Sequence, residues 1–388
     1  SRVSEGPVVK SFAPRLLQWF DQHGRSGLPW QMPRTPYRVW LSEIMLQQTQ
    51  VTAVIPYFLR FIERFATVQA LAEAYSDEVM RHWAGLGYYA RARNLHAAAR
   101  QVVAEHGGEF PQTLEGLVAL KGVGRSTAAA ILAQAFDTPA AILDGNVKRV
   151  LCRWAGIEGH PSEAATSGAL WRLAESLLPA TRAADYVQAQ MDLGATLCTA
   201  RKPACARCPL QTDCVAHRSG RVAELPARKP RRERPHREAW LLIAEDAEGR
   251  VLLEQRPGAG IWGGLWCPPV LPLGESASAL LAQRHGLCLR DEEAGEPIEH
   301  AFTHYDLTLH PLRGRAEAIG AALAERTPSD WLAPAALREG VVALPTPIAR
   351  YFAAGPQQRH LLPPAPVVSV RRPKTVRRPV RRATRENP

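Results

Sequence analysis

Four cysteines crowded into one short segment restrict the fold of this chain more than any other feature. Cys198, Cys205, Cys208 and Cys214 lie within 17 residues, with the spacing C-x6-C-x2-C-x5-C. Four thiolates this close in sequence can surround one metal centre, and zinc and an iron–sulfur cube both accept four cysteines. The spacing is not that of a disulfide framework. We therefore expect a metal-binding loop over 198–214 in a reducing compartment.

The rest of the chain divides by pattern into two domains. Its 388 residues are enough for two or three domains. Apolar residues recur at helical spacing up to about residue 220, with cap signals at Ser76 and Thr113, which predicts an all-α first domain over 1–220. A Pro-rich, charged linker is expected at 221–238, then an α+β domain at 239–362 and a disordered Arg/Pro-rich tail at 363–388. In the second domain we expect strands at 239–246, 250–257 and 304–314, a turn at Asp246–Gly249, and helices at 276–286 and 332–340.

The net charge of +11 is concentrated in two short segments. Residues 221–238 hold seven basic and three acidic residues, and residues 371–388 hold eight basic and one acidic. Basic segments beside globular regions favour a polyanion such as nucleic acid, although solubilising linkers would have the same composition. The N-terminus has no apolar signal core, and no apolar stretch reaches the ~18 residues of a membrane helix. A cytoplasmic protein without a membrane partner is expected.

Residues 113–136, TLEGLVALKGVGRSTAAAILAQAF, predict a helix, a tight turn and a second helix. Gly122 and Gly124 allow a sharp hairpin and close approach of the backbone to a ligand. The second helix should begin near Arg125 or Ser126, with free N–H groups that can bind phosphate without reading sequence. The pattern is typical of a DNA-phosphate clamp. A plain turn between packed helices is the alternative.

Two acidic residues have contrasting surroundings. Glu43 lies in the apolar segment VWLSEIML, where desolvation should raise its pKa and keep it protonated near neutral pH. Asp144, in AAILDGNVKRV, precedes a helix expected to begin near Val147, whose dipole favours an ionised carboxylate. Such opposed carboxylates catalyse glycoside hydrolysis. From the residues alone, an exposed glutamate at a helix start and a capping aspartate are equally good interpretations.

Five segments together resemble a known family. WLSEIMLQQTQV, GLGYYARARNL, LKGVGRSTA, ILDGNVKRVLCR and MDLGATLCTARKPACARCPL resemble the helix–hairpin–helix DNA glycosylases, and among them the adenine DNA glycosylases of the MutY type. The resemblance runs from about Leu28 to Cys214. It implies a cleft between one lobe at about 30–136 and a second, made of the N-terminal helix and 137–220. It also implies one [4Fe–4S] cluster on the four cysteines, duplex DNA as partner, and a monomer.

The resemblance also implies roles for individual residues. Glu43 would be the general acid that protonates adenine at N7. Asp144 would stabilise the oxocarbenium ion or attack C1′. Core packing is the plain alternative for Leu86 and Tyr88, and a solvated helix face is the alternative for Lys148. The implied adenine pocket holds Trp30, Ser126, Asn146 and Gln188, near Ser26; the implied DNA contacts are Gln48, Leu86, Tyr88, Gly122, Val123, Gly124 and Lys148, the first three also touching the partner base.

The position after the hairpin holds no lysine. Related glycosylases that cut the strand place a lysine nucleophile there, whereas this chain has Ser126. Without that amine no efficient Schiff base forms, so a monofunctional glycosylase is predicted. The alternatives are a bifunctional pyrimidine-lesion enzyme of the endonuclease III type and a non-catalytic iron–sulfur DNA-binding protein. The presence of both Glu43 and Asp144 argues against the second.

The second domain resembles the Nudix-like domain of adenine DNA glycosylases through QRPGAGIWGGLWCPP and FTHYDLTLHPLRG. In that family this domain recognises 8-oxoguanine opposite the adenine. The family's Phe-Ser-His loop maps onto Phe302, Thr303 and His304, and Thr303 keeps the hydroxyl of the commoner serine. Residues 274–293 lack the glutamate pattern that holds Mg²⁺ in Nudix hydrolases, so a recognition module is predicted. The whole chain is predicted to excise adenine opposite 8-oxoguanine, and more slowly opposite guanine.

Overall fold

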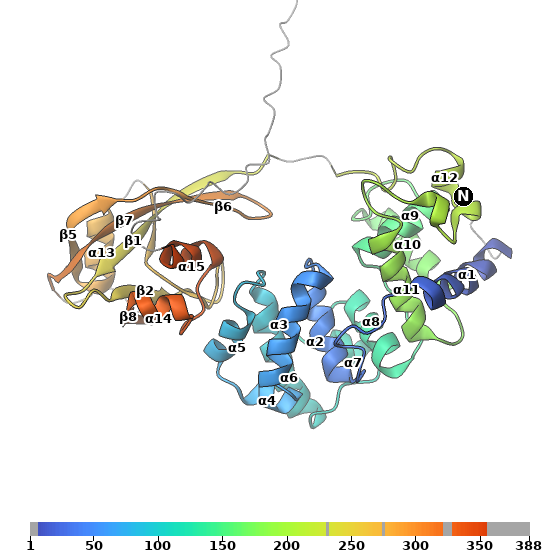
Figure 1. The fold of residues 1–388 in the computed structure, drawn as a ribbon, viewed down its shortest axis with the longest axis horizontal. Coiled ribbons are helices and arrows are strands. Elements are labelled where there is room, and N and C mark those ends of the chain that lie inside the picture. The colour runs from blue at the N-terminus through green and yellow to red at the C-terminus, as the bar shows by residue number, and fades with distance from the viewer. Residues whose placement is uncertain (1–6, 230–232, 274–275, 321–327, 355–388) are drawn as a thin grey trace, which may run out of the picture.

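The computed structural model describes residues 7–229, 233–273, 276–320 and 328–354. Helices fill the chain up to Arg218, and strands begin at His236, so the expected all-α domain followed by an α+β domain is confirmed (Figure 1). The expected tail at 363–388 lies outside the described residues, as does the end of the expected second domain. Among the described helices, none is both long and apolar enough to cross a membrane.

The first helical lobe, which we call the hairpin lobe, contains the helix–hairpin–helix. Its core is built on large side chains that are fully buried, among them Trp40, Phe58, Phe61 and Trp83. Thr113 caps the hairpin's first helix by accepting a hydrogen bond from the Gly116 N–H. The helices of this lobe are α2 (Pro36–Leu46), α3 (Val51–Arg64), α4 (Val68–Glu73), α5 (Ser76–Trp83), α6 (Ala90–His106), α7 (Leu114–Val118) and α8 (Arg125–Phe136).

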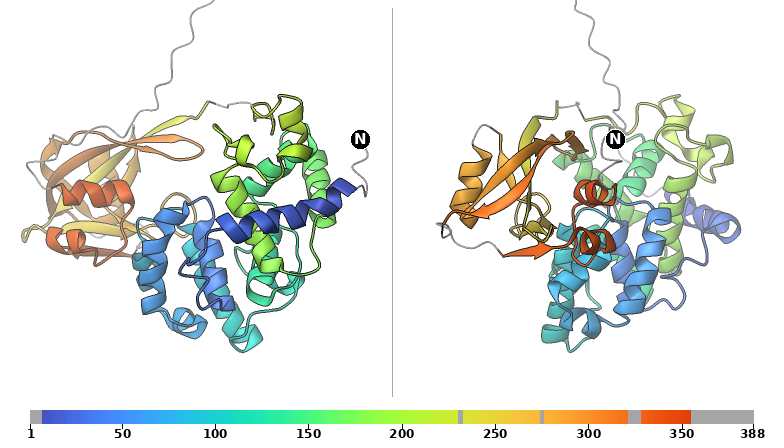
Figure 2. Two further views of the ribbon diagram at one scale, coloured as in Figure 1. Left: turned by 45° about the vertical axis from the view of Figure 1, so that its right-hand side comes forward. Right: turned by 60° about the vertical axis from the view of Figure 1, so that its left-hand side comes forward.

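The second lobe, the cluster lobe, joins the N-terminal helix to residues 137–220. Phe12 and Leu16 of the first helix pack with Leu151, Tyr186 and Leu193 in one buried cluster. The first helix lies across the other helices of this lobe (Figure 2). The elements are α1 (Pro7–His23), α9 (Gly145–Ala155), α10 (Ala164–Ser176), α11 (Ala183–Thr196), α12 (Val215–Arg218) and the short turns η1 (Cys205–Arg207) and η2 (Gln211–Asp213).

Helix α8 belongs to both lobes. Ala128 and Ile131 pack in the core of the hairpin lobe, whereas Ala129, Ala130 and Ala133 pack in the core of the cluster lobe. The helix accordingly lies between the two lobes in Figure 1. Because the distance between packed helices depends on the side chains at the contact, the small alanines let α2 and α11 approach α8 closely from opposite sides.

The second domain is a mixed sheet covered by helices on both faces. Strands β1 and β7 run parallel over ten paired positions, and the other described pairings are antiparallel. The strands are β1 (His236–Glu245), β2 (Val251–Gln255), β3 (Trp266–Cys267), β4 (Val270–Pro272), β5 (Leu287–Ala294), β6 (Ile298–Ala301), β7 (Asp306–Ala318) and β8 (Ser329–Leu332), in the order β3-β2-β1-β7-β5 with β4 on β1, β6 on β7 and β8 on β2; the helices are α13 (Ala277–His285), α14 (Pro334–Glu339) and α15 (Thr346–Ala353).

Alternate residues of β1 face the two helical layers. Leu242 packs with Leu281 of α13, and Leu241 lies in the cluster that holds Ile348 and Phe352 of α15. A strand buried on both faces needs a continuous apolar run, which is why AWLLIA predicts the strand correctly. The expected strands and helices of this domain are all present, and so is the Asp246–Gly249 turn, closed by a bond from the Gly249 N–H to the Asp246 carbonyl.

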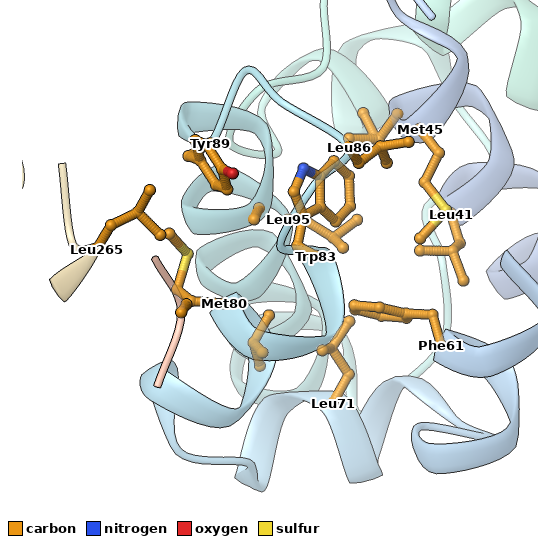
Figure 3. Packing of buried hydrophobic residues seen from close by; sticks show 14 of the residues in the cluster. Leu41, Met45, Phe61, Leu71, Met80, Trp83, Leu86, Tyr89, Leu95 and Leu265 are labelled. Atoms are coloured by element: carbon orange, nitrogen blue, oxygen red, sulfur yellow. The ribbon is translucent and has the colours of Figure 1, made fainter. Parts of the chain in front are cut away.

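The two domains touch through α5 and α6. Leu265, from the loop after β2, points at Met80 of α5 (Figure 3). Asp77 accepts hydrogen bonds from the Gln255 amide at 2.8 Å and the Trp266 indole at 3.4 Å. Nothing in the sequence pattern distinguishes these residues. The start of the expected linker is also packed: Leu225 is buried, and its carbonyl accepts a hydrogen bond from Arg153 of α9.

Candidate active site and iron–sulfur centre

Glu43 lies in the last turns of α2, so it is not the exposed glutamate at a helix start that the residues also allowed. Gln134 of α8 donates its Nε2–H to Glu43 Oε1 at 2.7 Å. The pKa of Glu43 is raised to about 7, mainly by burial; the bond from Gln134 opposes this rise, and the charge of Asp144 contributes to it. Asp144 is therefore close enough to act on Glu43. The two carboxylates come from different lobes, Glu43 from α2 and Asp144 from the start of α9.

Asp144 is the N-cap of α9. Its Oδ1 accepts a hydrogen bond from the Val147 N–H at 2.7 Å, so the capping interpretation is correct. The helix begins at Gly145, slightly earlier than expected. Burial is the largest influence and raises the pKa of Asp144 above its usual value, although bonds from Val147 and Asn146 and the charge of Arg149 oppose it. The helix start thus offsets only part of the cost of burying this charge.

The hairpin has an open helix start. Gly122 has φ +76°, and a Cβ there would lie 2.8 Å from Asn94 Cβ, so glycine is required twice over. Helix α8 begins at Arg125, as expected, and no side chain caps it. A Cβ at Gly124 would have no heavy atom within 4 Å. The N–H groups of the first turn are therefore free to bind a ligand oxygen.

The residues expected at the adenine pocket have structural partners of their own. Trp30 is buried, with its ring edge-on to Phe58 at 5.3 Å. Ser126 accepts a hydrogen bond at 2.9 Å from the N–H of Leu143, which holds the start of α8 against the residue before Asp144. Asn146 accepts from Arg149, and Gln188 donates to Asp192. Ser26 is exposed.

The three residues expected to enter the DNA stack differ in exposure. Gln48 and Tyr88 are exposed and have left-handed backbones, with φ of 57° and 48°. Such a conformation is uncommon for side-chain-bearing residues and is often found at functional sites. Leu86 is only 7% exposed and lies near Met45 and Trp83 (Figure 3), as the core-packing alternative has it. Of these three residues, Gln48 and Tyr88 are the exposed ones.

Two residues that contact the candidate site were not identified from the sequence. One is Gln134, whose only signal is a polar side chain in the apolar segment AAAILAQAF. The other is Arg91, a buried arginine at the start of α6 that joins the Gln48 segment to the Leu86–Tyr88 segment. Its guanidinium donates to the carbonyls of Ile44 (3.0 Å), Met45 (2.6 Å), Gln47 (2.7 Å), Leu86 (3.5 Å) and Gly87 (3.2 Å) and to Thr49 Oγ1 (3.1 Å).

The four cysteines line one cavity in the cluster lobe. Apolar side chains such as Leu193 and Leu210 form much of its wall. The pKa of Cys208 is raised to about 11, mainly by burial and also by the charges of the other three cysteines, so all four lie near one another. Among the described residues, no three of the His, Cys, Asp or Glu side chains converge on a point that would hold a single ion. Arg153 donates to Cys198 Sγ at 3.4 Å. An iron–sulfur cube fits this arrangement, because its ligands surround a volume.

The loop expected to read the partner base is the tip of the β6–β7 hairpin. Phe302 is held by rings on both sides, with Trp262 at 5.7 Å and Tyr305 at 4.8 Å between centroids. Its N–H bonds the Tyr305 carbonyl and closes the turn. Thr303 and His304 are exposed, with 3.4 Å between Thr303 Oγ1 and His304 Nδ1. The side chains that could meet a base are therefore free to do so.

Family models match all three functional parts of the chain. Residues 41–176 match the HhH-GPD superfamily base excision DNA repair protein, and residues 198–214 match the iron–sulfur binding domain of endonuclease III. Residues 239–354 match the NUDIX domain. The fold and site thus define a base excision repair protein of the helix–hairpin–helix class.

Individual relatives narrow this class. The chain is 35% identical over 320 residues to the adenine DNA glycosylase of Buchnera aphidicola subsp. Acyrthosiphon pisum (strain APS), which covers 82% of this chain and 91% of that protein. It is 36% identical to the adenine DNA glycosylase of Rattus norvegicus, over 84% of this chain and 73% of that one. The chain belongs to the adenine DNA glycosylase family. Among solved structures, a thermostable thymine-DNA glycosylase is similar with a TM-score of 0.50 and 29% identity, covering 55% of this chain and 97% of its own.

These matches confirm several expectations. The chain is an enzyme of DNA base excision repair. The cysteine loop belongs to a [4Fe–4S] cluster site, which resolves the choice between zinc and iron left open by the spacing. The Nudix-like domain is present, as expected.

Proposed function

We propose that this enzyme hydrolyses the N-glycosidic bond of adenine paired with 8-oxoguanine, and more slowly of adenine paired with guanine, without cutting the strand. The observation that carries the proposal is the pair of Glu43 and Asp144, which come from two lobes and lie close enough for the charge of Asp144 to raise the pKa of Glu43. A leaving base needs a proton and the sugar cation needs an anion, and the pair supplies both.

Glu43 is suited to be the proton donor. With a pKa of about 7, about half of the enzyme holds the proton at neutral pH. Gln134 bonds Oε1, which leaves Oε2 to carry the proton toward N7 of the flipped adenine. An ordinary glutamate at this pH would be almost fully ionised. Burial beside α8 therefore raises the pKa of Glu43 enough for it to act as the acid.

Asp144 is suited to stabilise the oxocarbenium ion, or to attack C1′. The Val147 N–H fixes the direction of its carboxylate. One charge pair at ~4 Å is worth about 4 kcal/mol at an effective dielectric near 20. That corresponds to about 10³ in rate, so loss of this charge alone should nearly abolish excision.

The surface around the pair is suited to extrude the base. The open start of α8 can bind a backbone phosphate through Gly122, Val123 and Gly124, with Lys148 on a second phosphate. Gln48 and Tyr88 project where they can fill the vacated stack. Extrusion costs a few kcal/mol, which these contacts offset. The pocket for the extruded base would include Trp30, Ser126, Asn146 and Gln188.

The second domain is proposed to read the partner base through Phe302, Thr303 and His304. Phe302 is fixed by ring contacts, and the exposed Thr303 hydroxyl and His304 ring can bond the base. At the other end of the enzyme, the cluster would hold the 198–214 loop in shape. We further propose that the enzyme acts as a monomer in a bacterial cytoplasm.

The test is excision from duplexes with adenine opposite 8-oxoguanine, guanine, cytosine or thymine. We expect rates in the order 8-oxoguanine, guanine, then the other two. Glu43→Gln and Asp144→Asn should each lose at least about 10³ in rate. An asparagine in place of Asp144 can still cap α9, so stability should change little. Glu163→Gln, an exposed glutamate at the start of α10, is the matched control. Full-speed release by either site variant, or strong nicking without added base, would contradict the proposal.

A further inference from the structure

One loop of the second domain contacts both the helical domain and the segment that is proposed to read the partner base. It comprises residues 256–265, which directly follow β2, and we call it the glycine loop. A main-chain hydrogen bond closes it, from the Arg256 N–H to the Leu265 carbonyl at 2.7 Å. A Cβ at Gly263 would lie 2.5 Å from the Gly258 carbonyl oxygen, so the two sides of the loop are in contact. Closely packed structure transmits strain, so the glycine loop should move as one piece.

The glycine loop is bound to α6 of the hairpin lobe. Arg93 Nη1 donates a hydrogen bond to the Gly263 carbonyl, and burial lowers the pKa of this guanidinium from its usual value. A Cβ at Gly264 would lie 3.7 Å from both Arg93 Cδ and Met80 Cε. Leu265, the next residue, points at Met80 (Figure 3). An arginine of α6 therefore holds a main-chain group of the second domain.

The glycine loop also packs on the tip of the β6–β7 hairpin. Trp262 is 6% exposed, and the centroid of its ring lies 5.7 Å from that of Phe302 and 5.9 Å from that of His300. Its backbone is left-handed, with φ of 54°, which for a bulky residue persists only where the surrounding contacts fix it. Trp262 directly precedes Gly263. The residue that packs on Phe302 is therefore joined by one peptide bond to the residue that accepts from Arg93.

Helix α6 brings this contact close to a residue expected to enter the DNA stack. Tyr88 stands five positions before Arg93 and next to Tyr89, the N-cap of α6. Tyr89 is hydrogen-bonded to the side chain of Thr346, the first residue of α15, so the start of α6 has a second bond to the second domain. The contacts between the domains therefore fix where Tyr88 lies relative to Phe302.

We propose that Arg93 and Trp262 are positioning residues for partner-base selection, which hold residues 302–304 and Tyr88 at the spacing at which both can contact one base. This inference rests on the proposed function, in which both contact the base opposite the adenine. Binding of an 8-oxopurine by residues 302–304 then favours, through the glycine loop, the position of α6 in which Tyr88 fills the vacated stack. Guanine lacks the 8-oxo group and favours that position less, because a ligand shifts a conformation only by its differential affinity.

The test is single-turnover excision of adenine opposite 8-oxoguanine and opposite guanine by Arg93→Met and by Trp262→Leu. Each substitution keeps an apolar side chain but removes the hydrogen bond or the aromatic ring. The ratio of the two rates should fall at least about fivefold in each variant, with the rate opposite guanine little changed. Arg100→Met and Trp331→Leu are the matched controls, because Arg100 donates to carbonyls within the hairpin lobe and Trp331 packs on the face of the sheet that α13 covers.

A double variant separates one shared connection from two independent effects. If both residues act through the glycine loop, Arg93→Met combined with Trp262→Leu should lower the ratio no further than either change alone, whereas independent effects would multiply. Multiplied effects, an unchanged ratio, or equal losses opposite both partner bases would each overturn the proposal, the last because it indicates a purely structural role.

Two further measurements keep the outcome clear. Melting temperature and the visible absorbance of the cluster show whether each variant is folded. Should Trp262→Leu fail to fold, Trp262→Phe takes its place, because it keeps a ring but shortens its reach toward Phe302, and the same fall in the ratio is expected. Failure of the proposed function is distinguishable, because the wild type itself would then show no preference for 8-oxoguanine over guanine. Failure of this inference alone would leave that preference intact in the wild type and in every variant.

Discussion

Replacing Arg91 with methionine should disable the enzyme without touching a reacting atom. Its guanidinium bonds three carbonyls at the end of α2, and it also bonds the Leu86–Gly87 segment. Burial lowers the pKa of Arg91 to about 10, so the group stays charged at neutral pH. Methionine fills a similar volume but donates nothing. The carbonyls lose their partner, and the two segments lose the group that joins them.

The size of the effect follows from these contacts. Leaving a buried carbonyl without its hydrogen-bond donor costs about 1–3 kcal/mol. The left-handed backbones of Gln48 and Tyr88 cost on the order of 1–3 kcal/mol each. The two terms are comparable, so without Arg91 the two segments should relax to ordinary backbone angles. Misplacement by about 1 Å near a reacting centre costs about 100-fold in rate, and we expect at least that loss.

The assay separates binding, base extrusion and chemistry. Single-turnover excision gives the rate, titration of a duplex gives the affinity, and a fluorescent adenine analogue at the target site reports unstacking. Arg91→Met should bind DNA within a few-fold of the wild type but fail to unstack the base. Arg100→Met is the matched control, because Arg100 also donates to carbonyls from α6, at 3.1 and 3.4 Å, but on α4 and its end. Equal unstacking and equal rates in both variants would refute the reasoning.

Four further predictions concern other parts of the molecule. The excision rate should fall about tenfold per pH unit above pH 7, because Glu43 must hold its proton, and a rate that is flat from pH 7 to 9 would remove it as the acid. The pKa of Glu43 is raised on folding, so stability is lost as pH rises from 4.5 to about 7; Glu43→Gln should melt higher than the wild type at pH 8 and equally at pH 4 in a thermal scan. Cys205→Ser should lose the visible absorbance of the cluster and melt lower, and a colourless wild-type protein reconstituted with iron and sulfide would contradict the cofactor assignment. Thr303→Val should narrow the gap between 8-oxoguanine and guanine as partner bases with little change opposite guanine, and an unchanged ratio would exclude the hydroxyl from recognition.

Local features were predictable from sequence because neighbouring residues determine them. Thr113 caps its helix, α8 begins at Arg125, and Asp144 caps α9, each through contacts within four positions. The expected cap at Ser76 is wrong: Tyr75 precedes the helix, and Ser76 is its first residue. Acidic residues in the first turn predict the helix itself but not which residue caps it.

Features that depend on distant segments were not predictable. The bond from Gln134 to Glu43 spans 91 positions, and without it the direction of the acid is unknown. Leu86 and Tyr88 lie in the same family-like segment, GLGYY. Leu86 nevertheless packs in the core, where its apolar side chain lies near Met45. Strand β5, in which four charged residues follow one another, has no apolar alternation to indicate it. It forms because β7 supplies its partner.

The alanine faces of α8 have a consequence for how activity can be lost. Acid and anion are delivered by opposite halves of the enzyme, and the width of one slender helix determines the gap across which they cooperate. A larger side chain at Ala129 or Ala133 would push the two lobes apart. Both carboxylates would then keep their own neighbours, yet the enzyme would be inactive because the two groups would be too far apart to cooperate. Inherited or engineered changes that touch no ligand can therefore be as damaging as deleting a carboxylate.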